Sequence, residues 1–101
     1  MGDGGMKMFW VYLLECADGS FYTGHTDDLE RRFFEHQHPQ DSFCYTASRL
    51  PVTLVYQREF TSRYEALTVE RQIKGWSRKK KIALIAGDWG LVSILSKNRQ
   101  V

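Results

Sequence analysis

The order of apolar and polar positions near the start of the chain predicts a β-hairpin. Residues 9–15 are almost entirely apolar or aromatic, and the turn-forming sequence Ala17-Asp18-Gly19 separates them from a second run of β formers. We expect two antiparallel strands, over residues 9–16 and 20–24. These strands would form the first half of a small sheet.

The length of the turn decides how two tyrosines of this hairpin are arranged. A three-residue turn would pair Leu14 with Tyr22 and place Tyr12 diagonally from Tyr22 on the same face. A two-residue turn would put the tyrosines on opposite faces, because successive side chains of a strand alternate between faces. The sequence leaves both arrangements open.

A short helix, a long loop and a third strand are expected next. Asp27 or Asp28 can cap a helix over residues 29–36. Residues 37–51 hold both prolines of the chain and several polar side chains, which is typical of a loop. Residues 52–60 are rich in β formers and predict a strand.

Two helices complete the predicted domain. Ser62 and Glu65 have the spacing of a capping box, so a helix should begin there and end near Gly75. Ser77 can cap another helix, which Gly87 would stop. The predicted order is therefore β-β-α-β-α-α.

This order indicates a single α+β domain with a three-stranded, mainly antiparallel sheet flanked by helices. The length of 101 residues, 43% of them hydrophobic and 26% charged, fits one such domain. We expect it to span residues 8–90, after a flexible extension over 1–7 and before a tail over 91–101.

Charge and cysteine content narrow the functional classes. The formal net charge is only +2, but residues 1–70 are net acidic and residues 71–101 are strongly basic. Two cysteines are too few for a disulfide framework or a four-cysteine zinc site. Without an apolar run of roughly 20 residues or a signal-peptide pattern, we expect a cytoplasmic protein with no membrane partner.

Several short motifs follow one another along the first part of the chain: Val11-Tyr12-Leu13, Tyr22-Thr23-Gly24, Asp28-Leu29, Arg31-Arg32 and Glu35-His36. In this order and at these spacings they resemble the GIY-YIG nuclease domain. Later stretches are Tyr45-Thr46, Arg49, Pro51, Leu54-Val55-Tyr56, Glu65-Ala66-Leu67, Glu70, Ile73-Lys74-Gly75-Trp76 and Leu84-Ile85. They are similar to the small stand-alone bacterial subfamily of unassigned function within this family (UPF0213-like). The resemblance spans residues 8–90.

The resemblance implies an endonuclease that hydrolyses phosphodiester bonds in DNA or another nucleic acid with Mg²⁺ or Mn²⁺. Tyr12 matches a candidate general base, Tyr22 a residue that orients water or phosphate, and Arg32 a clamp for phosphate oxygens. His36 matches a position that holds a proton-transferring or phosphate-contacting side chain. Glu70 matches the metal ligand.

The chain also departs from the family pattern. Val11 stands where the first glycine is usual and Thr23 where isoleucine is usual, but both are packing positions. Residues 36–40 lack the asparagine and glycine that usually follow the helix histidine, so the loop to Tyr45 is expected to differ. This difference bears on the choice of substrate more than on chemistry.

A basic run near the C-terminus is the candidate nucleic-acid interface. The candidate contacts are Arg31, Lys74, Arg78, Lys79, Lys80 and Lys81. Such a run is either a solvated helix face or a set of phosphate contacts, and Trp76 either stacks on a base or packs between two helices. A chain of this size leaves no room for a separate DNA-binding domain, so we expect low intrinsic specificity or a protein partner that supplies it.

Other interpretations stay open. The fold and basic helices could serve a nucleic-acid-binding module that cleaves little or nothing, or a protein-interaction module. Taken alone, Tyr12 and Tyr22 would be packed strand aromatics, and Glu70 with Lys74 a solvated helix pair. His25 is expected to be an exposed loop histidine.

Overall fold

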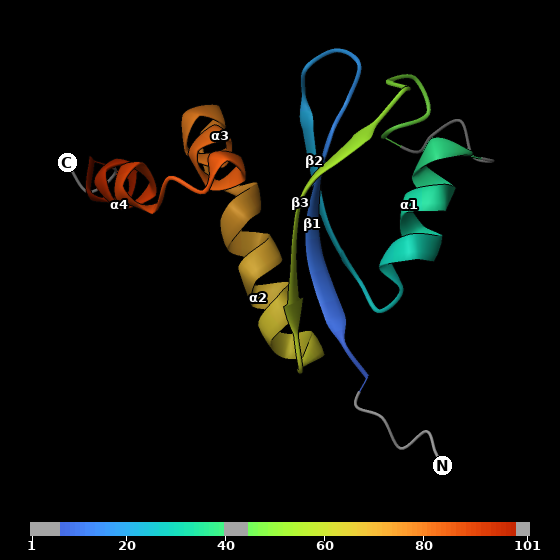
Figure 1. The fold of residues 1–101 in the computed structure, drawn as a ribbon, viewed down its shortest axis with the longest axis horizontal. Coiled ribbons are helices and arrows are strands. Elements are labelled where there is room, and N and C mark those ends of the chain that lie inside the picture. The colour runs from blue at the N-terminus through green and yellow to red at the C-terminus, as the bar shows by residue number, and fades with distance from the viewer. Residues whose placement is uncertain (1–6, 40–44, 99–101) are drawn as a thin grey trace.

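The computed structural model describes residues 7–39 and 45–98 (Figure 1). Most of the expected N-terminal extension, the middle of the predicted loop and the end of the predicted tail lie outside these residues. The elements are β1 (Phe9–Glu15), β2 (Phe21–Thr26), α1 (Leu29–Gln37), β3 (Thr53–Phe60), α2 (Arg63–Lys74), α3 (Arg78–Ala86) and α4 (Trp89–Asn98). The predicted α+β fold and its order are confirmed, with α4 as an additional helix.

The sheet has the strand order β2-β1-β3, and both pairs are antiparallel. The hairpin has the three-residue turn: the N–H of Cys16 donates to the carbonyl of Ser20 at 2.8 Å, and Leu14 pairs with Tyr22. Gly19 in this turn has a φ of 84°, which side chains with a Cβ rarely adopt. Tyr12 and Tyr22 therefore lie on one face of the sheet.

Helices cover both faces of the sheet, α1 on one and α2 on the other (Figure 1). Successive side chains of β1 point to opposite faces of the sheet, so alternate residues pack against the two helical layers. Val11 and Leu13 pack into a buried cluster with residues of α2, α3 and α4, whereas Tyr12 and Leu14 pack with Phe33 of α1. The two predicted tyrosines therefore face α1.

The helix caps explain where the helices begin. Asp28, not Asp27, caps α1 by accepting a hydrogen bond from the N–H of Arg31 at 3.1 Å. Ser62 and Ser77 cap α2 and α3 as predicted.

Within residues 7–39 and 45–98, none of the helices combines the length and apolar character that a membrane span needs.

The helix α4 lies where a tail was expected. It packs mainly on α3, away from the sheet (Figure 1). Asp88 starts it, because its carboxylate accepts a hydrogen bond from the N–H of Leu91 at 3.0 Å. Only one residue of α4 with described burial, Val92, is buried.

Candidate functional site

Tyr12 and His36 meet between the sheet and α1. Oη of Tyr12 lies 2.9 Å from Nε2 of His36, and both side chains are buried. On the other side of the ring, Nδ1 lies 3.2 Å from Oγ1 of Thr46, whose hydroxyl donates to the main-chain carbonyl of His36. Because that hydroxyl has one hydrogen, its oxygen accepts from Nδ1, and Nε2 accepts from Tyr12.

Burial sets the protonation states of this pair. Burial, and then the positive charge of Arg32, lowers the pKa of His36 from 6.5 to about 4, so the ring is neutral at pH 7. Burial raises the pKa of Tyr12 well above 10, and Tyr22 adds to this effect. The pair is therefore a neutral phenol that donates to a neutral imidazole.

Gly24 makes room for the Tyr12 hydroxyl at the edge of the sheet. Gly24 lies opposite Tyr12 in the β1–β2 pair, and β2 is an edge strand. A Cβ at position 24 would lie 2.6 Å from Oη of Tyr12 and 3.0 Å from Cε1 of Tyr22. Gly24, the last residue of the Tyr22-Thr23-Gly24 motif, thus leaves the space into which both tyrosine side chains pack.

Tyr22 and Arg32 border this hydrogen-bonded pair. The Tyr22 ring centroid lies 4.7 Å from that of His36 and 6.2 Å from that of Tyr12. Arg32 donates to Glu35 at 3.1 Å. Burial lowers the pKa of Arg32, but Glu35, Tyr12 and Tyr22 together hold it above its usual value. Four of the predicted site residues, Tyr12, Tyr22, Arg32 and His36, therefore lie together, with a permanent positive charge beside two phenols.

Tyr45 extends this group of rings. Its ring centroid lies 5.7 Å from that of Tyr22, and its hydroxyl donates to Ser20 at 2.9 Å. The guanidinium of Arg49 lies 4.0 Å from the Tyr45 ring centroid. The loop before β3 is thus fixed against the hairpin turn, next to the site.

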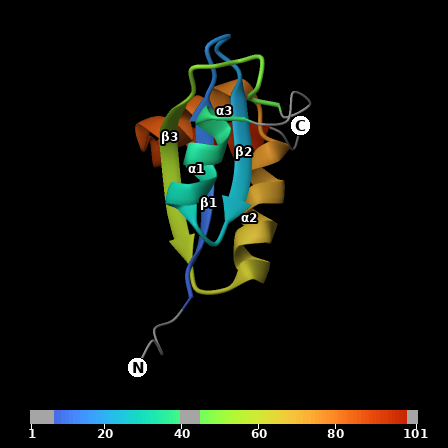
Figure 2. The ribbon, with the colours of Figure 1, turned by 90° about the vertical axis from the view of Figure 1, so that its right-hand side faces the viewer.

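Glu70 approaches from the opposite layer. It lies on α2, which runs alongside β2 (Figure 2), and its side chain is only 9% exposed. Oε1 accepts from Nδ1 of His25 at 2.9 Å, and Oε2 lies 3.3 Å from Nζ of Lys74. The negative charge of Glu70 is also one cause, after burial, of the raised pKa of Tyr12. The predicted ion pair with Lys74 exists, but its carboxylate is largely buried.

The donor set around Glu70 fits a hard divalent cation. Among the residues that the structure describes, no three His, Cys, Asp or Glu side chains lie close enough to form a metal cage. Zinc is held by three or four protein ligands, whereas Mg²⁺ commonly takes one or two carboxylates and completes its shell with water and phosphate oxygens. A single buried carboxylate, such as that of Glu70, suits the second mode.

The candidate nucleic-acid contacts on α3 differ in how exposed their charges are. Lys79 is exposed, whereas Lys80 is buried, with Nζ 4.0 Å from the Trp76 ring centroid. Arg78 donates to the carbonyl of Gly19 in the hairpin turn. Burial also lowers the pKa of Lys81.

The two remaining candidate contacts are paired with acids. Arg31 lies 3.9 Å from Glu35, and Lys74 lies 3.3 Å from Glu70. Trp76 is half-buried and packs against the core cluster, in line with the packing interpretation of this side chain.

Two residues of this site were not predicted from the sequence. His25 was expected in an exposed loop, but this expectation is wrong: it lies in β2, its side chain is 24% exposed, and it bonds to Glu70. Thr46 was not singled out as a partner of His36. Neither contact has a signal in the spacing of residues, because both join segments that meet only in the folded chain.

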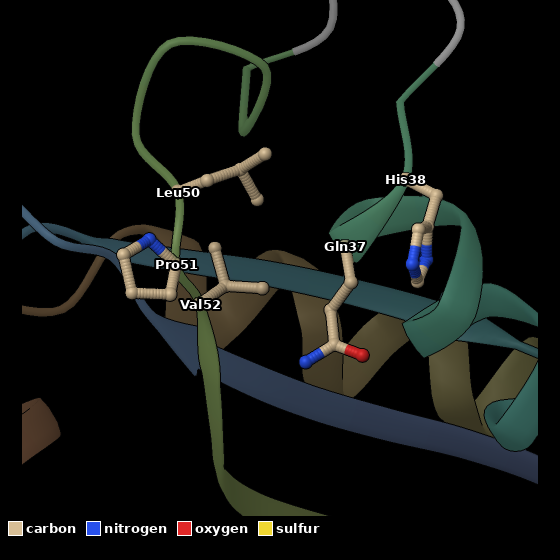
Figure 3. A pocket seen from close by; sticks show the side chains of 5 residues that line it. All are labelled: Gln37, His38, Leu50, Pro51 and Val52. Carbon is tan, nitrogen blue, oxygen red and sulfur yellow. The ribbon is translucent and has the colours of Figure 1, made fainter.

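A separate pocket of about 490 Å³ lies beside the C-terminal end of α1. Gln37, His38, Leu50, Pro51 and Val52 line it, as Figure 3 shows. None of the lining residues belongs to the Tyr12 and His36 site. The His38 ring stacks on Phe34, with the centroids 4.2 Å apart.

Comparison with known proteins shows the family to which this chain belongs. The model of the GIY-YIG catalytic domain matches residues 8–83. The UPF0213 protein SSP2268 of Staphylococcus saprophyticus is 44% identical over 81 residues, which cover 80% of this chain and 98% of that protein. The UPF0213 protein VNG_2274C of Halobacterium salinarum is 47% identical over 77 residues, which cover 76% of this chain and 99% of that protein.

Two solved structures are also similar to this chain in sequence and fold. The solution NMR structure of the UPF0213 protein BH0048 from Bacillus halodurans is 42% identical, with a TM-score of 0.52, and the match covers 78% of this chain and 83% of that one. The solution NMR structure of EF2693 from E. faecalis is 34% identical, with a TM-score of 0.57, over 80% of this chain and 85% of that one. The chain therefore belongs to the GIY-YIG catalytic domain family and, within it, to the UPF0213 proteins.

Proposed function

We propose that this protein is a divalent-metal-dependent endonuclease that hydrolyses phosphodiester bonds in nucleic acid, above all DNA, with low intrinsic sequence specificity. The observation that carries the proposal is the hydrogen bond from Tyr12 to His36, because it gives a phenol beside an arginine a route for its proton. Packing alone does not explain why a buried tyrosine and a buried histidine bond to each other beside the partly exposed Arg32.

In this mechanism Tyr12 is the general base for the attacking water. Oη of Tyr12 accepts a proton from water while its own proton passes to Nε2 of His36, so that hydroxide attacks phosphorus and the phenol stays neutral. The P–O bond to the leaving oxygen breaks as the new bond forms, and the leaving oxygen takes up a proton from solvent. A bound phosphate would offset the charge of Arg32, which is one cause of the low pKa of His36. The imidazole would then be a stronger base when substrate is present.

Arg32, Tyr22 and Glu70 supply the electrostatics. The guanidinium of Arg32 offers two parallel N–H groups to the non-bridging phosphate oxygens, where negative charge accumulates during displacement. Tyr22 orients the water or the phosphate beside the His36 ring. Glu70 would hold Mg²⁺ or Mn²⁺, which supplies Lewis-acid stabilisation of the phosphate when bound.

The decisive experiment compares cleavage and binding of labelled duplex, single-stranded and branched DNA at low salt with Mg²⁺ or Mn²⁺. Arg32→Ala and Glu70→Gln are expected to abolish cleavage while the DNA still binds. Arg58→Ala and Glu59→Gln are matched controls, because both residues are exposed on β3. Both controls should cleave at the wild-type rate.

The same experiment tests the second candidate, a nucleic-acid-binding module. This candidate is favoured by the Lys74 ammonium, which already lies against Glu70, and by the exposed charge of Lys79. Salt-sensitive DNA binding without cleavage of any substrate would overturn the endonuclease and support the module.

A further inference from the structure

Both oxygens of the Glu70 carboxylate have a partner of their own. Oε1 accepts from His25 at 2.9 Å, and Oε2 faces the Lys74 ammonium at 3.3 Å. The two partners reach Glu70 from different elements, because His25 lies on β2 and Lys74 lies one turn further along α2. The two oxygens are therefore not equivalent.

His25 holds its oxygen firmly. Its side chain is 24% exposed and lies on a paired strand, where its backbone is fixed opposite Val11. Because a carboxylate oxygen can only accept, Nδ1 of His25 carries the hydrogen of this bond. The bond thus fixes the orientation of the carboxylate, as partners of metal-binding carboxylates commonly do.

Lys74 holds the other oxygen loosely. Its side chain is 55% exposed, and an exposed lysine on a helix loses little free energy when it leaves an ion pair. The ammonium is nevertheless a cation at the one carboxylate oxygen that His25 leaves available. A divalent ion at Oε2 has to compete with the ammonium, because two cations bound to the same oxygen repel each other.

We propose that His25 and Lys74 set the metal affinity of Glu70 in opposite directions. His25 is a positioning residue that fixes Oε1 and presents Oε2, and Lys74 is a resident cation that leaves Oε2 when a divalent ion binds. The proposal rests on Glu70 as the metal ligand of the proposed function. It adds two residues and a sign for the effect of each.

The test measures Mn²⁺ binding to the full chain without nucleic acid, by electron paramagnetic resonance of free Mn²⁺ and by calorimetry. Lys74→Gln should bind Mn²⁺ about two- to five-fold more tightly than wild type, because the competing charge is gone. His25→Leu should bind about tenfold more weakly. His25→Asn should recover most of this loss, because its amide keeps an N–H donor near the position of Nδ1.

Arg71→Gln is the matched control for charge. It removes one positive charge from the same helix, but neighbouring helix positions do not face the same side. Its Mn²⁺ affinity should change far less than that of Lys74→Gln. An equal gain in Arg71→Gln would show a general charge effect and overturn the role of Lys74.

The remaining outcomes separate this proposal from the proposed function. If wild type binds Mn²⁺ and Glu70→Gln does not, but Lys74→Gln binds no more tightly or His25→Leu no more weakly, the proposal fails while Glu70 stays the metal ligand. If Glu70→Gln binds Mn²⁺ as well as wild type does, the metal role of Glu70 fails, and this proposal fails with it. Lys74 is exposed, so its variant tests the proposal even if His25→Leu does not fold.

Discussion

The hydroxyl of Tyr12 lies 2.9 Å from Nε2 of His36, although the two residues are 24 positions apart and come from different layers. The contact depends on the whole architecture: the three-residue turn places Tyr12 on the α1 face, and Gly24 leaves the space that its hydroxyl fills. Thr46 then fixes the tautomer of His36 from the loop before β3. A chain of hydrogen bonds thus links Tyr12, His36 and Thr46, and it is the path that the proposed proton transfer would take.

Tyr12→Phe tests this path directly. The ring and its packing stay, but the oxygen that would take the proton from water is lost, so cleavage should fall by about 10² to 10⁴. Stability should fall by about 1 to 3 kcal/mol, because Nε2 of the buried His36 loses its donor. Cleavage assays and urea unfolding measure the two effects.

Tyr64→Phe is the control for this variant, because Tyr64 is 78% exposed on α2, and it should change neither quantity. Wild-type cleavage by Tyr12→Phe would remove Tyr12 from the role of general base. A stability loss without a rate loss would leave the hydrogen bond a purely structural one.

The low pKa of His36 predicts a pH-dependent stability. The pKa is about 4 in the folded protein and 6.5 when unperturbed, so between these values the unfolded chain binds the extra proton. Stability is therefore fully present above pH 6.5 and decreases as the pH falls towards 4. The contribution lost between pH 7 and pH 5 is about 2 kcal/mol.

Urea unfolding of wild type and His36→Gln at a series of pH values checks this prediction. His25 and His38 are present in both proteins, so the difference between the two curves isolates His36. Between pH 7 and pH 5 the wild type should lose about 2 kcal/mol more than the variant. Parallel curves would mean that the buried imidazole is not held neutral.

Local signals were enough to predict most of the fold. Ser62 and Ser77 cap α2 and α3 as their spacing indicated, and Gly87 ends α3 with a φ of 74°. These features depend on a few neighbouring residues, which a sequence displays directly. The turn length, left open by the sequence, was decided by pairing along the whole hairpin.

The contacts within the site could not be predicted in the same way. His25 and Glu70 are 45 residues apart, and their bond exists because α2 packs along the edge strand β2. The pairing of His36 with Thr46 depends on the course of the loop before β3, where the sequence departs from the family pattern. Such contacts follow from tertiary packing, and single residue types do not indicate them.

The tight space around Gly24 predicts a strong effect of one methyl group. In Gly24→Ala the new Cβ would lie 2.6 Å from Oη and 2.8 Å from Cζ of Tyr12, so the ring has to move. Such overpacking should cost about 1 to 3 kcal/mol, and cleavage should fall because Tyr12 is displaced from His36. Thermal or urea unfolding and a cleavage assay check both.

Gly90→Ala provides the matched change in open space. Its Cβ would meet Asp88 at 3.6 Å, an ordinary contact, and alanine favours the helix α4 by up to about 1 kcal/mol. Gly90→Ala should therefore be as stable as wild type or more so. Equal stability of the two alanine variants would show that the Tyr12 hydroxyl does not fill the space beside Gly24.

The difference in burial between Lys79 and Lys80 predicts that Lys79 contributes to DNA binding and Lys80 to stability. The exposed Lys79 is free to contact a phosphate. In Lys79→Gln the slope of the logarithm of the DNA-binding constant against the logarithm of the salt concentration should therefore become less steep by about one. The free energy of unfolding should stay within about 0.5 kcal/mol of wild type. Lys80 is 5% exposed against Trp76, so Lys80→Gln should lower stability by about 1 kcal/mol and leave the salt dependence unchanged. Fluorescence anisotropy of labelled DNA between about 50 and 200 mM salt gives the first quantity, and urea unfolding gives the second. If Lys80→Gln reduces the salt dependence of DNA binding and Lys79→Gln does not, then Lys80 contacts the nucleic acid and Lys79 does not.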